Sequence, residues 1–178
     1  MKLMTALGKA YFKGRILLSL LKGTYVLLLE NIHAVDIKVG SLDQLRFDKG
    51  FYAYVGSMFG PGELKARIGR YFAVKRRHWH IDYILDHIKI FEVYVLPEKD
   101  YESRLAKAAV RRFKYVKDFG CSDRKNDVSH LICLRSEREL GAFLKLVGSL
   151  GFKRFEPSSE TSLDRCYVDE CGKHKNNI

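Results

Sequence analysis

The residues of this chain that could do chemistry are two tyrosines in short motifs and one arginine. Tyr25 ends Gly23-Thr24-Tyr25, Tyr54 begins Tyr54-Val55-Gly56, and each tripeptide lies in an apolar run that predicts a β-strand. A phenol can orient or deprotonate water if a nearby cation or metal lowers its pKa from about 10. Arg67 lies on the polar face of a predicted amphipathic helix, and a guanidinium can bind two oxygens of one phosphate. These residue types suggest chemistry on a phosphate ester.

Each of these residues also has a structural interpretation. Tyrosines on strands are most often core aromatics. Arg67 could belong to a solvated basic helix face, because Lys65 and Arg70 are its neighbours. Neither tripeptide is specific by itself, so the ordered set carries the argument.

A histidine-rich segment, His78-Trp79-His80-Ile81-Asp82, offers a second kind of chemistry. On a strand, His78 and His80 would share a face and could bind one metal ion. We favour a different interpretation, in which one histidine contacts the phosphate or acts as a general base. Trp79 would then pack in the protein or stack on a nucleobase. A satisfied structural histidine is the remaining alternative, and His130, in a predicted core strand, is expected to be mainly structural.

The composition favours a polyanionic partner. Lys+Arg 32 against Asp+Glu 21 gives a net charge of +11, which suits nucleic acid or an anionic membrane surface. The hydrophobic fraction of 47% is typical of a folded chain. No stretch approaches the roughly 20 apolar residues of a membrane helix, so we expect a soluble, cytoplasmic protein. The four cysteines form no C-x-x-C pair, which argues against a zinc ribbon or a redox dithiol.

The elements that must position these residues follow from hydrophobic spacing and turn residues. Tyr25 and Tyr54 are expected on adjacent strands of a three-stranded meander. Asp100 is expected to cap the helix that follows it, and Ser136 the next helix, with Glu139 in a capping box. The predicted strands are 25–29, 35–39, 51–55, 91–96 and 130–134, and the predicted helices are 3–20, 63–72, one starting near 82, 101–113 and 136–150.

Several motifs together resemble the GIY-YIG nuclease superfamily, in particular its archaeal Uri-like branch. The similarity covers about residues 22–134, and the helix 64–72 resembles that of the UvrC-type repair nucleases, with Tyr71 matching their tyrosine. The chain departs from the branch at Arg124-Lys125-Asn126, where members often have cysteines, and has a hairpin-like insertion at 32–50. The motifs are 23–29, 52–57, Gly60-Pro61-Gly62, 78–83, Phe119-Gly120-Cys121-Ser122-Asp123 and Ser129-His130-Leu131.

The resemblance implies a fold and a domain division. The fold is a small α+β GIY-YIG-like domain, with a central, mainly antiparallel sheet of three to five strands flanked by helices. The nuclease domain would span 22–134, between an N-terminal helical extension, 1–21, and a C-terminal helix and flexible tail, 135–178.

The resemblance also implies an activity, a metal-dependent endonuclease that hydrolyses phosphodiester bonds, in DNA more than RNA, in repair or defence. One Mg²⁺ or Mn²⁺ ion would be held by Glu102, although an acidic residue at a helix start also stabilises the dipole without metal. Glu98 and Asp100 lie close to Glu102 in the sequence and could be mistaken for the metal-binding residue. The catalytic residues would be Tyr25, Tyr54, Arg67, Tyr71 and His80, and the nucleic-acid-binding residues Lys65, Arg70, Lys75, Arg76, Arg77, His78 and Trp79.

Two alternatives stay open. The first is a non-catalytic nucleic-acid-binding module that retains the fold and uses Lys75–Arg77 together with Arg111, Arg112, Lys114 and Lys117. The second is a structural subunit whose positive charge docks an acidic protein. The oligomeric state does not follow from the sequence.

Overall fold

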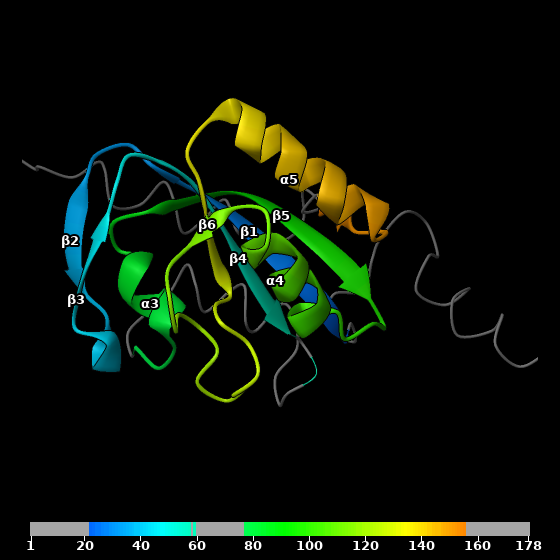
Figure 1. Ribbon diagram of the computed structural model, residues 1–178, viewed down its shortest axis with the longest axis horizontal. Helices are drawn as coiled ribbons and strands as arrows, with labels where there is room; N and C mark the ends of the chain where they lie inside the picture. The colour runs from blue at the N-terminus through cyan, green and yellow to red at the C-terminus, as the bar shows by residue number, and fades with distance from the viewer. Residues whose placement is uncertain (1–21, 58, 60–76, 156–178) are drawn as a thin grey trace, which may run out of the picture.

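The computed structural model describes residues 22–57, 59 and 77–155. These residues form an antiparallel six-stranded sheet in the order β6-β7-β4-β1-β5-β8, a separate two-stranded ribbon, β2-β3, and three α-helices (Figure 1). The α+β class with a mainly antiparallel sheet is therefore confirmed. The strands are β1 Gly23–Asn31, β2 Val35–Lys38, β3 Gln44–Phe47, β4 Gly50–Ser57, β5 Lys89–Pro97, β6 Lys114–Tyr115, β7 Leu131–Leu134 and β8 Lys153–Arg154, and the helices are α3 His80–Ile84, α4 Glu102–Val110 and α5 Glu137–Ser149, with the short 3₁₀ helix η3 Gly40–Leu42.

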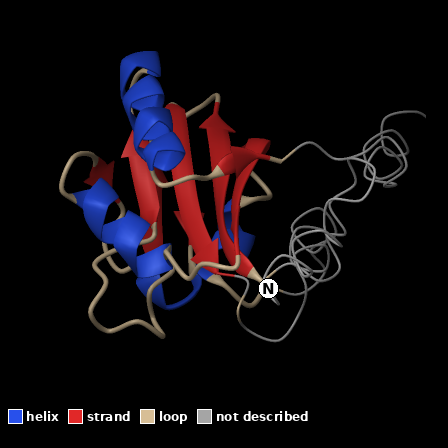
Figure 2. Ribbon diagram, turned by 90° about the vertical axis from the view of Figure 1, so that its right-hand side faces the viewer, coloured by secondary structure: helices blue, strands red, loops and turns tan. Residues whose placement is uncertain are grey.

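The central strand β1 is covered on both faces, which explains its continuous apolar run. Side chains alternate between faces along a strand. The odd-numbered residues of β1 contribute to one hydrophobic cluster, with Ile81 and Ile84 of α3 and Ile37 of β2. The even-numbered residues contribute to a second cluster, with Leu105 of α4 and Phe143 of α5. Figure 2 shows α4 and α5 on one face of the sheet and the short α3 on the other.

The expected meander is only partly right. β1 and β4 are adjacent, but β2 does not join them; it pairs with β3 in a ribbon over the α3 face. This ribbon is the insertion expected from 32–50. The turn before β4 is short, because Phe47 still belongs to β3 and is buried in the core. The two-residue strands β6 and β8, which extend the sheet to six, are too short to give a periodic signal.

The two expected helix caps have different outcomes. Ser136 caps α5, and its side chain accepts a hydrogen bond from the backbone N–H of Glu139. The Glu139 carboxylate, however, accepts from the N–H of Arg135 at 2.8 Å. Asp100 does not cap α4: Tyr101 holds that position without a side-chain cap, and the Asp100 carboxylate pairs instead with Arg124 at 3.2 Å. The cation of a distant loop has displaced the expected local contact.

No helix among the described residues is long and apolar enough to cross a membrane. The expected helices 3–20 and 63–72 and the expected flexible tail beyond residue 156 lie outside the described residues.

Candidate active site at one end of the sheet

The two tyrosines lie on neighbouring central strands and on the same face of the sheet. In the register of β1 and β4, Tyr25 is opposite Gly56 and Leu27 is opposite Tyr54. The two rings therefore meet diagonally, with centroids 6.4 Å apart. Both side chains belong to the cluster beneath α3, and Tyr25 is 1% and Tyr54 6% exposed. Both phenols are thus held within a packed layer.

Gly56 is required by the position of the Tyr25 ring. A Cβ atom at Gly56 would lie 2.3 Å from Cζ of Tyr25 and 2.4 Å from its hydroxyl oxygen. No side chain can be accommodated there without moving the ring, which is enclosed by the core. The two tripeptides are therefore one unit, in which the glycine of β4 makes room for the tyrosine of β1.

The start of β1 brings α4 to the same end of the sheet. Thr24 is fully buried, and its hydroxyl donates to the carbonyl of Lys99 at 2.7 Å and accepts from the N–H of Tyr101 at 2.8 Å. These two bonds tie the β5–α4 connection to the residue beside Tyr25. Glu102 consequently begins α4 at the end of the sheet where the tyrosines lie, but α4 covers the opposite face.

Glu102 is buried and already paired. The side chain is 10% exposed; its Oε2 lies 2.7 Å from Nε of Arg124, and its Oε1 lies 3.4 Å from Nδ1 of His130. Arg124 is anchored a second time by Asp100. The carboxylate expected to hold a metal therefore lies between a guanidinium and an imidazole.

His130 connects Glu102 to a second buried carboxylate. The imidazole is fully buried, and its Nε2 lies 3.0 Å from Oδ2 of Asp127. Asp127 is also hydrogen-bonded by Ser103, and its Oδ1 lies 3.3 Å from Nζ of Lys107. This cluster, which we call the α4 ion cluster (Asp100, Glu102, Ser103, Lys107, Arg124, Asp127 and His130), fixes the loop 118–130 onto the start of α4.

The cluster favours a charged His130. Burial alone would lower the pKa of this imidazole, but the hydrogen bonds and negative charges of Glu102 and Asp127 outweigh burial and raise it above its ordinary value. For the same reason the pKa of Asp127 is lowered: burial opposes the charge, and the hydrogen bonds from Ser103, His130 and Lys107 outweigh it. The expectation of a structural role for His130 agrees with this placement.

His80 lies on the tyrosine side of the sheet end. Its Nδ1 accepts a hydrogen bond from the backbone N–H of Gly120 at 3.0 Å, and its ring contacts Phe119, which in turn contacts Tyr54. Burial lowers the pKa of the imidazole. An acceptor at Nδ1 places the single proton of the neutral ring on Nε2. His80 in this arrangement can donate a hydrogen bond through Nε2, whereas a base would need that nitrogen unprotonated.

The histidine-rich segment does not form the strand that a shared metal face would need. His80 is the first residue of α3, and Oδ2 of Asp82 accepts from the backbone N–H groups of His78 and Trp79, at 2.9 and 2.8 Å. Asp82 therefore holds the turn into the helix. Among the described residues, no group of three or more His, Cys, Asp or Glu side chains could hold a metal ion.

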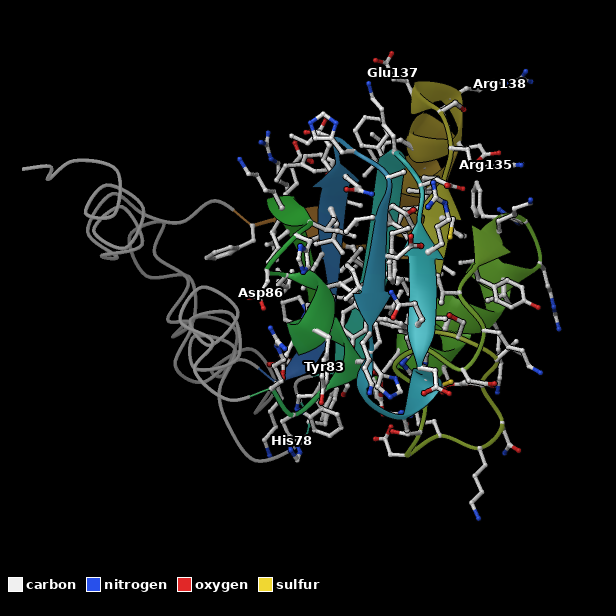
Figure 3. The ribbon with its side chains drawn as sticks, turned by 90° about the vertical axis from the view of Figure 1, so that its left-hand side faces the viewer. His78, Tyr83, Asp86, Arg135, Glu137 and Arg138 are labelled. Carbon is white, nitrogen blue, oxygen red and sulfur yellow. The ribbon has the colours of Figure 1, made fainter. Side chains whose placement is uncertain are left out.

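The surface residues before α3 also have local partners. His78 precedes α3 and Tyr83 belongs to it, and both lie at the opposite end of the molecule from Arg135, Glu137 and Arg138 at the start of α5 (Figure 3). Arg77 forms an ion pair with Asp86 and lies over the ring of Tyr83. The exposed imidazole of His78 contacts the ring of Trp79. The other residues expected at this site, Lys65, Arg67, Arg70, Tyr71, Lys75 and Arg76, lie outside the described residues.

The sequence interpretation missed Arg124 and Asp127. The sequence feature that could have indicated them is the pair of motifs 119–123 and Ser129-His130-Leu131, because Arg124 and Asp127 lie between these motifs, in the segment that carries His130. Gly120 explains part of that motif. Its φ is +74°, and a Cβ atom there would lie 2.8 Å from the Tyr54 ring and 3.2 Å from Cβ of His130. This glycine thus lets the loop pass between the phenol on one face and the ion cluster on the other.

A family model described as Domain of unknown function DUF123 matches residues 24–151. The chain belongs to this family. The segment that matches the DUF123 model begins one residue before Tyr25 and includes both tyrosines, the α4 ion cluster and all of α5. Comparison with curated proteins and with solved structures gave no match.

The chemistry of Glu102 suits Mg²⁺ or Mn²⁺, which bind carboxylate oxygens and complete their shells with water and phosphate. In the conformation described, a metal would have to replace Arg124 at Oε2. The site therefore fits such an ion as a single-carboxylate site with a resident competing cation.

Proposed function

We propose that this DUF123 protein is a metal-dependent endonuclease that hydrolyses phosphodiester bonds in nucleic acid, with DNA preferred to RNA. The proposal combines the resemblance of the sequence motifs to the GIY-YIG superfamily with the geometry of the sheet end. A role in DNA repair or in defence against foreign DNA would suit this activity.

One observation carries the proposal. Tyr25 and Tyr54 come from adjacent central strands, their ring centroids lie 6.4 Å apart, and the Tyr25 ring depends on Gly56 for its space. Thr24 ties the start of α4 to the same end of the sheet. The Tyr25 ring occupies the space over Gly56, which fixes the position of its phenol beside Tyr54.

In this proposal each residue has a separate role. Tyr54, and Tyr25 behind it, orient the attacking water and accept its proton, assisted by the positive charge of Arg67, which also binds the scissile phosphate. His80 donates a hydrogen bond through Nε2. Glu102 would hold the metal ion, whose chemistry at this site would be to supply positive charge near the leaving oxygen. Tyr71 follows Arg67 by four residues, so it would lie on the same side of the helix that the sequence predicts there.

A second candidate is a nucleic-acid-binding module without catalysis. It is favoured by the pairing of both Glu102 oxygens with Arg124 and His130, because a carboxylate with two cationic partners does not need a metal. The fold and the partner would be the same in both candidates, and the carboxylate would then serve only the α4 ion cluster.

The nicking of supercoiled plasmid DNA in the presence of Mg²⁺ or Mn²⁺ tests the proposal. Wild-type protein should nick the plasmid, and Tyr54→Phe, Arg67→Ala and Glu102→Gln should each lower the rate by at least about 100-fold, typical of losing one catalytic contact. Lys49→Ala, at an exposed turn far from the site, is the control that should retain activity. Nicking that is equal in wild type and Arg67→Ala would show that the activity is a contaminant or that the site is elsewhere.

A further inference from the structure

The solvent face of α4 and the edge strand β6 form a continuous basic surface. From Ser103 to Lys117 the chain has six cationic residues and no acidic residue. All six are exposed, while the apolar residues of the same segment, such as Leu105 and Ala109, are buried in the core. We call this surface the α4–β6 strip; its residues are Arg104, Lys107, Arg111, Arg112, Lys114 and Lys117.

Helical spacing aligns the first half of the strip. Arg104, Lys107 and Arg111 are separated by three and four residues, so they lie in one row along the solvent side of α4. The row begins at Arg104, two residues after Glu102, at the end of the sheet that carries the tyrosines. The chain then continues through Arg112 into β6, the outermost strand next to β7 (Figure 1). Tyr115 lies opposite Ile132 of the second cluster and therefore on the α4 side of the sheet, whereas Lys114 lies opposite Cys133, which packs against the first cluster, so the strip turns around the sheet edge at Lys114.

Five of the six cations are not neutralised by a described carboxylate. Lys107 is paired with Asp127, but Arg104, Arg111, Arg112, Lys114 and Lys117 form no ion pair within the described part of the chain. Arg104 lies 4.6 Å over the ring of Tyr101, which holds its guanidinium in place without reducing its charge.

This arrangement is not what stability alone would select. Like charges three or four residues apart destabilise a helix by about 0.2–0.5 kcal/mol per pair, and a cation in the first turn, such as Arg104, opposes the helix dipole. Lysines on an edge strand do protect against edge-to-edge pairing, which accounts for Lys114. The helix dipole accounts for Lys107, in the last turn of α4, and for Arg111, at its C-cap, but not for Arg104.

An aromatic side chain lies within the strip. Tyr115, on an edge strand between cationic residues, is 40% exposed. Burying its ring would stabilise the fold more than this exposed position does. An exposed aromatic between phosphate-binding cations is typical of surfaces on which an unpaired base stacks.

We propose that the α4–β6 strip binds the backbone of a nucleic acid that contains an unpaired stretch, with Tyr115 stacked on a base. From the proposed function this inference takes only that the partner is a nucleic acid. It places the main binding surface on the α4 face of the sheet and its β6 edge, whereas Trp79, one of the residues that the sequence favoured, packs on the opposite, α3 face. The strip leads along α4 to Glu102, so a strand bound there runs toward the candidate active site.

Binding measured in EDTA tests the inference independently of cleavage. The probes are a fluorescein-labelled single strand of about 20 nucleotides and the matching duplex, titrated between about 50 and 200 mM salt. Arg111→Gln/Arg112→Gln/Lys114→Gln should bind both probes at least about tenfold more weakly, and its slope of log K against log salt should be shallower by roughly two. Tyr115→Ala should weaken the single strand by about fivefold or more and change the duplex less.

The matched control is Lys38→Gln/Lys49→Gln/Lys89→Gln, which removes the same charge from exposed positions outside the strip. Equal losses in the two triple variants would overturn the inference, because the affinity would then depend on net charge alone. Binding to vesicles rich in phosphatidylserine but to neither DNA probe would also overturn it. Strong binding without plasmid nicking would contradict the proposed nuclease activity but support the strip. Nicking by the wild type, with an unaltered salt slope in the strip variant, would support the nuclease activity and contradict the strip.

Discussion

At the scale of single residues, the contact between Gly56 and Tyr25 has the clearest consequence. Gly56→Ala places a methyl group 2.3 Å from the ring carbon Cζ of a tyrosine that is 1% exposed. The ring cannot leave without opening the core, so we expect a loss of about 2–4 kcal/mol in the free energy of unfolding, measured by urea denaturation.

Gly141→Ala is the control for this substitution. Gly141 lies within α5, and no described atom outside its own helical turn lies within 4 Å of the place that an added methyl group would take. The same added group should there stabilise the protein by about 0.5–1 kcal/mol, because glycine is unfavourable inside a helix. A destabilisation of similar size at both positions would contradict the steric explanation.

Arg124 occupies one oxygen of Glu102, the carboxylate that we propose as the metal ligand. Arg124→Gln removes the cation 2.7 Å from Oε2 and leaves an amide that a divalent ion can displace more readily. Mn²⁺ should therefore bind Arg124→Gln several-fold more tightly than wild type in isothermal titration calorimetry, and Glu102→Gln should abolish binding in both backgrounds. Weaker Mn²⁺ binding by Arg124→Gln would mean that the arginine supports the metal site.

At the scale of elements, α4 and the loop 118–130 are held together by buried charges, which gives the fold a pH dependence. The pKa of His130 is raised in the folded state, so the folded protein keeps a proton that the unfolded chain releases above about pH 6.5. The stabilisation is complete below that value and is lost as the pH rises through the folded pKa.

The measurement compares wild type with His130→Gln in urea at several pH values between about 5.5 and 9, with EDTA present. The difference in the free energy of unfolding should shrink as the pH rises. The Cε1 proton resonance of His130 should titrate above about pH 6.5 in wild type. A constant difference across the range would show that the imidazole is held neutral.

The N-terminus of α5 depends on one hydroxyl. Ser136 accepts from the N–H of Glu139, so Ser136→Ala should cost about 1 kcal/mol in thermal or urea unfolding. Ser136→Asp preserves an acceptor and should retain most of the stability. Equal losses in the two variants would mean that the hydroxyl serves another contact.

At the scale of the whole molecule, the second core cluster needs elements that are far apart in the sequence. Phe143 and Val147 of α5 are fully buried against β1 and β7 residues, and β8 pairs with β5. A fragment 22–134 would expose this face of the sheet. We therefore expect 22–155 to give a cooperative unfolding transition and 22–134 to lack one in circular dichroism. Cooperative folding of the shorter fragment would favour the domain boundary expected at residue 134, which stays a prediction.

The local sequence determined much of the framework. Periodicity located β1, β4, β5, α4 and α5 because burial on one or two faces leaves a repeating apolar pattern. Tyr25 and Tyr54 were expected on adjacent strands of a meander; the pairing of β1 with β4 confirms the adjacency, although β2 does not complete the meander. The +11 charge similarly follows from composition alone.

Tertiary structure decided the rest, because it depends on groups that the chain brings together from a distance. Arg124 forms ion pairs with Asp100, which was expected to cap α4, and with Glu102. These partners lie more than twenty residues earlier in the chain, so no local sequence pattern indicates the pairing. Asp82 closes the turn before α3, which removed the strand that His78 and His80 would have shared. Residue types fix what each side chain can do, whereas three-dimensional packing fixes which partners each one meets.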